Sequence, residues 1–98
     1  MPIEIEHEKD VKPGEYYEDC SYHPCVCIRI DDDEVSGISL IDGSYPRSCS
    51  IQGCGIRKLT YKEAIQWKFY GPPDVELENK YKWWSANDDV AKMYAPKE

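Results

Sequence analysis

The sequence predicts an α+β domain: a small, strongly bent antiparallel sheet of about four to five short strands, one helix and a short C-terminal helix. Short strand-like runs separated by turn signals fill the chain up to about residue 59, and a helix signal follows directly. The chain has 98 residues, which indicates a single domain spanning 1–98.

The clearest predicted strand is Cys25–Ile30. Its side chains alternate between two faces, with Val26, Ile28 and Ile30 on one face and Cys25, Cys27 and Arg29 on the other. The acidic run Asp31–Glu34 is typical of a solvated hairpin turn, and Val35–Ile41 is then the partner strand. Gly37 in that strand predicts a bulge or a close approach of another backbone.

The remaining strands are shorter. Residues 1–11 form either an edge strand or a frayed terminus, because Ile3 and Ile5 alternate with glutamates. Further strands are predicted at Glu15–Asp19 and Ile56–Leu59. Asp42-Gly43 favours a two-residue hairpin turn, which would make Ser44–Ser50 a strand as well.

The helix has the strongest local signals in the chain. Thr60 and Glu63 have the spacing of a capping box, and Gly71-Pro72-Pro73 ends the pattern. One face is predicted to carry Tyr61, Ala64, Ile65, Lys68 and Phe69. A second, weaker pattern predicts a peripheral helix within residues 85–98. From Lys12 to the helix, the chain is similar in length and element order to an SH3-like open barrel.

Composition limits the classes of function. The net charge of −7 opposes binding to nucleic-acid phosphates and to anionic membranes. No apolar run reaches the length of a transmembrane helix, and the acidic start does not resemble a signal peptide, so we expect a cytoplasmic protein. Five cysteines are an odd number, which argues against a disulfide framework.

The loop of residues 42–55 has the densest polar chemistry. Tyrosine, tryptophan and arginine are common anchors of recognition surfaces, and the candidate binding residues are Tyr45, Arg47, Tyr22 and Trp67. The favoured hypothesis is therefore a small non-enzymatic protein-interaction module that uses this loop to bind a protein partner. The alternative for the loop is that Tyr45 packs on the core and Arg47 pairs with a nearby acid.

The cysteines support a second hypothesis, a structural zinc site. The candidate ligands are Cys25, Cys27, Cys49 and Cys54, drawn from a wider group that includes Cys20 and His23. No Cys-x-x-Cys pair is present, which favours packed or surface thiols over a zinc site, with disulfides as a further alternative. A cysteine-dependent enzyme is a further alternative, because His23 and Arg47 lie near cysteines in the sequence.

A third hypothesis follows from charge alone. An acidic inhibitor or immunity-type protein would use the surplus of carboxylates to cover a basic partner.

Overall fold

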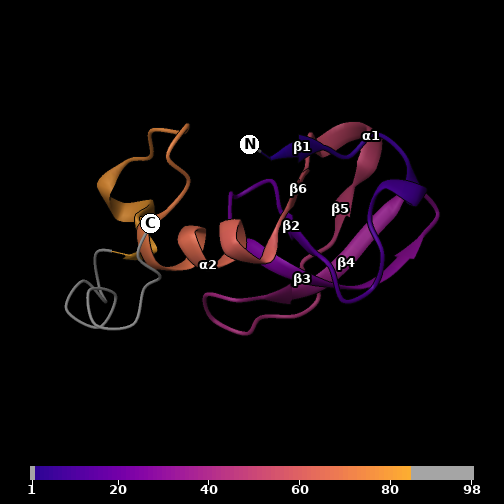
Figure 1. The fold of residues 1–98 in the computed structure, drawn as a ribbon, viewed down its shortest axis with the longest axis horizontal. Helices are drawn as coiled ribbons and strands as arrows, with labels where there is room; N and C mark the ends of the chain where they lie inside the picture. The colour runs from indigo at the N-terminus through magenta and orange to yellow at the C-terminus, as the bar shows by residue number, and fades with distance from the viewer. Residues whose placement is uncertain (1, 85–98) are drawn as a thin grey trace.

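The computed structural model describes residues 2–84 and shows a small α+β domain (Figure 1). Six strands form one antiparallel sheet in the order β1-β6-β2-β3-β4-β5. They are β1 (Ile3–Glu4), β2 (Tyr16–Glu18), β3 (Pro24–Asp31), β4 (Glu34–Ser39), β5 (Cys49–Ser50) and β6 (Arg57–Leu59). The helices are α1 (Ile51–Cys54) and α2 (Tyr61–Tyr70), with 3-10 turns η1 (Glu8–Asp10) and η2 (Asn79–Tyr81).

The fold class is thus confirmed, with one correction. The sheet has six strands rather than four to five. Of the two alternatives for residues 1–11, the edge strand is present as β1, although it is only two residues long. The SH3-like barrel is not confirmed. The C-terminal helix predicted within residues 85–98 lies outside the described residues. Among the described residues, no helix combines the length and the apolar character that crossing a membrane requires.

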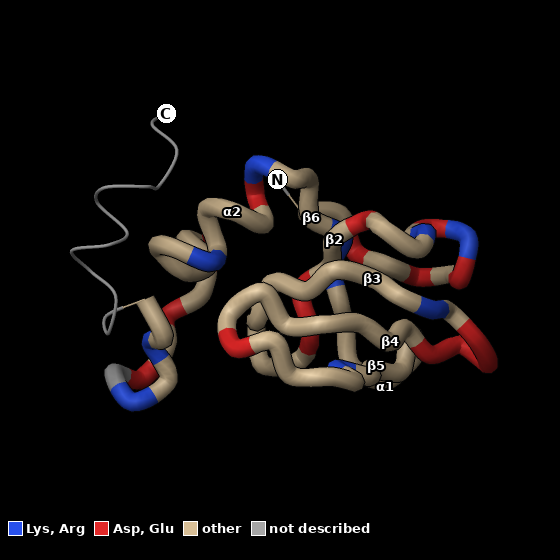
Figure 2. The backbone as a smooth tube through the Cα atoms, turned by 90° about the horizontal axis from the view of Figure 1, so that it is seen from below, with Lys and Arg blue, Asp and Glu red and all other residues tan. Residues whose placement is uncertain are grey.

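The β3–β4 hairpin carries the acidic run at its tip, which is prominent in Figure 2. Asp32 and Asp33 have φ angles of 51° and 58°, a left-handed pair that matches the twist of the flanking strands. The solvated turn predicted for Asp31–Glu34 is therefore present. The turn also contacts the rest of the domain, because the Ile51 amide donates to the Asp33 carbonyl oxygen at 2.8 Å.

The cysteine face of β3 points into the core. Cys25 and Cys27 are fully buried, whereas Ile28 is 43% exposed. A bulge between Cys27 and Arg29 shifts the register, so that Ile30 packs against the same core as the cysteines. The predicted alternation of Val26, Ile28 and Ile30 on one face therefore fails after the bulge.

Gly37 lies opposite that bulge, where two strands and a ring come together. A Cβ atom at this position would collide with the Val26 carbonyl oxygen and the Tyr17 side chain. The close backbone approach predicted from Gly37 is therefore confirmed, and the position has no room for a larger residue.

The predicted strand Ser44–Ser50 is wrong except for its last two residues, which are β5. Asp42-Gly43 belongs to a wider turn in which the Gly43 amide donates to the Ser39 carbonyl oxygen at 2.9 Å. The chain then passes beside β4, held by a 2.8 Å hydrogen bond from the Arg47 amide to the Gly37 carbonyl oxygen. Residues 40–48 are consequently a loop fixed to the sheet.

Helix α2 begins at the predicted capping box. The Thr60 hydroxyl accepts from the Glu63 amide at 3.1 Å, and the Glu63 carboxylate accepts from the Thr60 amide at 2.9 Å. Ala64 and Trp67 form its buried stripe, while Tyr61 is exposed, so the apolar face is rotated from the one predicted. The reason is Trp67, whose indole reaches a buried carboxylate of β2.

Candidate functional site

Two neighbouring acids at the end of β2 organise the polar interior. Glu18 and Asp19 are only 2% and 4% exposed. Buried carboxylates are costly unless they are paired. Each of these two is paired with an arginine from a distant part of the chain, Glu18 with Arg57 and Asp19 with Arg47.

Asp19 holds together the β2–β3 loop and the 40–48 loop. Its Oδ1 accepts from the backbone amides of Ser21 and His23, both at 2.9 Å. Its Oδ2 accepts from Nε of Arg47 at 2.9 Å and lies 2.8 Å from Nη2 of the same guanidinium. The carboxylate thus closes the β2–β3 loop on itself and fixes the arginine at the same time.

The backbone of Arg47 is held as firmly as its side chain. Its amide bonds to β4, and its carbonyl oxygen accepts from the hydroxyl of the buried Tyr17 at 2.6 Å. Burial raises the pKa of the Tyr17 hydroxyl well above its usual value, so it stays a donor. Arg47 thus pairs with an acid, as one part of the alternative for this loop expected, and the acid is Asp19. The other part is wrong, because Tyr45 is 56% exposed rather than packed on the core.

A cavity of about 590 Å³ opens beside this ion pair. Its lining comes from the β2–β3 loop, the 40–48 loop and the segment after α2, and consists of Ser21, Tyr22, His23, Arg47, Leu77 and Tyr81. Two of the four predicted binding residues, Tyr22 and Arg47, therefore meet at one site. The other two do not line it: Tyr45 is exposed in the loop, and Trp67 is buried in the core.

His23 forms one wall of the cavity and is half-buried. Burial lowers its pKa; the nearby Asp19 carboxylate opposes this effect and Arg47 reinforces it. Its Nδ1 lies 3.2 Å from Nη2 of Arg47 and 3.3 Å from the Ser39 hydroxyl. The ring also meets Trp83 edge-on, with centroids 4.9 Å apart. A neutral imidazole beside a guanidinium is the arrangement that these contacts favour.

Glu18, by contrast, is enclosed on every side. It accepts from Nε and Nη2 of Arg57 at 2.8 and 2.7 Å, and from the indole Nε1 of Trp67 at 2.6 Å. The Arg57 guanidinium also contacts Asp74, so that it lies between two carboxylates. These contacts raise the pKa of Arg57 and connect β2, β6, α2 and the segment after the helix.

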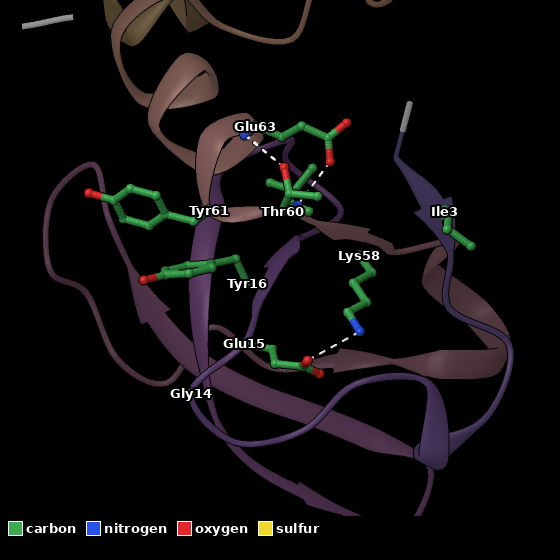
Figure 3. A pocket seen from close by; sticks show the side chains of 9 residues that line it. Ile3, Gly14, Glu15, Tyr16, Lys58, Thr60, Tyr61 and Glu63 are labelled. Carbon is green, nitrogen blue, oxygen red and sulfur yellow. Dashed lines mark hydrogen bonds and ion pairs between the residues drawn. The ribbon is translucent and has the colours of Figure 1, made fainter. Parts of the chain in front are cut away.

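A second hollow, of about 470 Å³, lies where β1, β6 and the start of α2 meet (Figure 3). The rings of Tyr16 and Tyr61 lie against each other with centroids 5.8 Å apart. The charged groups that Figure 3 shows there already have partners, because Lys58 pairs with Glu15 at 3.2 Å and Glu63 belongs to the helix cap. This hollow therefore offers few polar groups to a ligand.

The structure divides the predicted zinc ligands into two groups. Cys25 and Cys27 are core residues, and burial raises the pKa of Cys25 to about 12. Cys49 and Cys54 lie near each other and are joined by Cys20, with the three sulfurs all within 4.8 Å of one another. Burial also raises the pKa of Cys49, which disfavours a free, reactive thiolate there.

Sequence reasoning missed several residues that matter at these sites. Asp19 was predicted only as the end of a strand. An aspartate at the start of a loop often accepts hydrogen bonds from nearby backbone amides, as Asp19 does from Ser21 and His23. Leu77 and Tyr81 had no signal that places them beside Arg47, because the fold alone brings residues 77–81 to this cavity.

Comparison with known proteins adds no relative: no model of a protein family, no curated protein and no solved structure matches the chain.

Proposed function

We propose that the protein is a small, non-enzymatic interaction module that recognises a carboxylate next to an apolar side chain, as at the C-terminus of a partner protein. The observation that carries this proposal is the meeting of Tyr22 and Arg47 in one cavity, together with His23, Leu77 and Tyr81. Its volume of about 590 Å³ is in the range of roughly 300–1,000 Å³ that is usual for small-ligand pockets.

The guanidinium of Arg47 supplies the polar anchor. Within residues 2–84, the guanidinium makes its side-chain contacts through Nε and Nη2, which leaves Nη1 for a ligand. Asp19 compensates much of its charge, so the arginine binds through directed hydrogen bonds more than through a strong field. Because Asp19 and the Gly37 carbonyl oxygen hold Arg47 in place, little side-chain entropy is lost on binding.

The other walls suit an apolar group. Tyr22 and Tyr81 contribute aromatic side chains to the lining, and Leu77 an aliphatic one. The neutral form of His23 adds no second charge. A ligand with a carboxylate at one end and an aromatic or aliphatic side chain beside it meets both kinds of surface. At the C-terminus of a protein, the carboxylate and the last side chain are both attached to the same Cα atom.

The test uses two small probes, N-acetyl-L-phenylalanine and its carboxamide, which differ only in the charged group. Each is titrated into the ¹⁵N-labelled full chain and followed by NMR. We expect shifts at residues 21–23, 47, 77 and 81, a Kd on the order of 1 mM, equivalent to about −4 kcal/mol, and clearly weaker binding of the carboxamide.

Two exposed tyrosines give matched variants. Tyr81→Ala removes a cavity wall and should weaken binding of the acid several-fold, whereas Tyr61→Ala lies at the start of α2 and should not change it. Equal binding of acid and carboxamide would refute the role of Arg47. Shifts that cluster around Tyr16 and Tyr61 would place the binding site in the second hollow instead.

A further inference from the structure

The three clustered cysteines lie on separate turns of the chain that the fold brings together. Cys20 is in the β2–β3 loop, Cys49 is in β5, and Cys54 ends α1. The single helical turn of α1 carries Cys54 back towards Cys49, and the Ser50 hydroxyl caps this turn by accepting from the Gly53 amide at 3.2 Å. Two Cys-x4-Cys spacings in the sequence thus contribute three, not four, thiols to one point.

The distances between the sulfur atoms suit one metal ion. All three lie within 4.8 Å of one another, and the sulfurs of Cys20 and Cys49 are 3.5 Å apart. Thiolates bound to tetrahedral zinc at about 2.3 Å lie about 3.8 Å from each other. Small rotations of the side chains would bring all three into the first coordination sphere, with no movement of the backbone required by these distances.

The surroundings also fit a bound thiolate group. A hollow of about 250 Å³ touches Cys20 and Cys49 and is also lined by Arg47. Cys20 is exposed, so an ion can enter from this side, and the hollow has room for a water molecule or small anion as the fourth ligand.

We propose that Cys20, Cys49 and Cys54 form a binding site for one soft divalent ion of the Zn²⁺ or Cd²⁺ type, with a fourth position open to the hollow. In the binding step three thiols each form a bond to the ion and release a proton, so M²⁺ and three RSH give M(SR)₃⁻ and three H⁺. No electron is transferred. This ligand set differs from the one that the sequence predicted, because Cys25 and Cys27 are replaced by Cys20.

Such an ion would connect the β2–β3 loop to the continuous segment formed by β5 and α1. It would tie the β2–β3 loop to β5 and to the end of α1, and so brace the loops on either side of Arg47. Binding to the folded form alone raises stability by mass action. At a free ion concentration of 100 times Kd, we expect the melting temperature to rise by on the order of 10 °C. The site does not depend on the recognition cavity being functional.

The test titrates Co²⁺, then Zn²⁺ and Cd²⁺, into the full chain, previously reduced with a phosphine and freed of metal with a chelator. We expect one Co²⁺ per chain, with the intense visible bands of tetrahedral cobalt and sulfur-to-cobalt charge transfer in the near ultraviolet, both lost when Zn²⁺ displaces it. Cys20→Ser and Cys54→Ser should each weaken binding by more than about 10-fold.

Cys27→Ala is the matched control, since it removes a thiol of the predicted set but none of the three clustered ones. It should keep the cobalt spectrum and stoichiometry of the original chain. The proposal fails if cobalt stays octahedral, if Cys27→Ala abolishes binding as Cys20→Ser does, or if the reduced chain binds no ion. It also fails if mass spectrometry shows that Cys20 and Cys49 form a disulfide even in the phosphine-reduced chain.

Discussion

Glu18 and Asp19 are consecutive residues with the same charge, similar burial and the same kind of partner, yet they do different things. Glu18 is surrounded by Arg57 and the Trp67 indole, and its contacts join the sheet to helix α2. Asp19 is bound to Arg47 at the edge of a cavity, and part of that guanidinium faces open space. The two arginine side chains are similarly exposed, 21% for Arg57 and 24% for Arg47, so exposure alone does not separate the pairs. What separates them is that Arg57 meets a second carboxylate, Asp74, whereas Arg47 lines a cavity.

The largest effect should come from the enclosed pair. Glu18→Gln removes the charge that Arg57 and Trp67 both contact, and breaking a buried pair from one side costs about 3 kcal/mol or more. Urea denaturation should show this loss in the free energy of unfolding. A loss below about 1 kcal/mol would mean that Arg57 is satisfied by Asp74 alone, and that Glu18 does not hold α2 to the sheet.

Removing the arginine of the other pair should cost less. Arg47→Ala leaves Asp19 buried, but the carboxylate keeps the two backbone amides of its loop and a long contact from the Cys25 thiol as donors. We therefore expect a loss of about 2 kcal/mol. The same denaturation experiment measures it. A larger loss in Arg47→Ala than in Glu18→Gln would show that the Asp19–Arg47 pair contributes more to folding than the enclosed pair.

The cap of helix α2 tests the structural role of Glu18. Thr60→Ala removes the acceptor for the Glu63 amide, and it should cost about 1 kcal/mol. Because α2 carries Trp67 to Glu18, this loss should not be fully additive with that of Glu18→Gln. Unchanged stability in Thr60→Ala would show that the helix does not need this cap.

The pH dependence of stability tests the polar cluster around Asp19. The pKa of His23 is lowered in the folded chain. The neutral imidazole therefore contributes to the free energy of unfolding above the unfolded pKa of 6.5, and this contribution is lost as the pH falls through the folded pKa. The groups that act on the ring are Asp19, Arg47 and Asp42. Stability should therefore decline below pH 6.5, and His23→Gln should reduce that decline. A decline of equal size in the variant would assign it to carboxylates elsewhere.

Opposite behaviour is expected at high pH. Burial raises the pKa of Cys25 to about 12. Its neutral thiol therefore contributes to the free energy of unfolding below the unfolded pKa of 9.0, and this contribution is lost as the pH rises towards 12.

The fold could be predicted where local physics decides. The cap of α2, the acidic turn and the crowded Gly37 each depend on a few neighbouring residues, and all three were predicted. The inward face of β3 was not, because isoleucine and cysteine differ too little in pattern to show which side a bulge will bury. The two-residue strands β1 and β5 lie within predicted strands, but their short lengths were not predicted.

The site was only half predictable. Tyr22 and Arg47 were singled out by residue type, and the structure brings them together. Their partner Asp19, 28 residues from Arg47 in the chain, could not be identified without knowing which loops meet. Likewise, Cys20 joins Cys49 and Cys54 only because the β2–β3 loop lies beside β5.

The most direct measurement compares affinity for N-acetyl-L-phenylalanine in Glu18→Gln and Arg47→Lys, each checked to be folded by its NMR spectrum. We expect Glu18→Gln to bind the probe within about twofold of the original chain despite its lower stability. Arg47→Lys keeps a cation but loses the planar fork, so it should bind about 10-fold more weakly at a small cost in stability. Equal affinities in the two variants, or a larger loss of affinity in Glu18→Gln, would contradict the assignment of probe binding to Arg47.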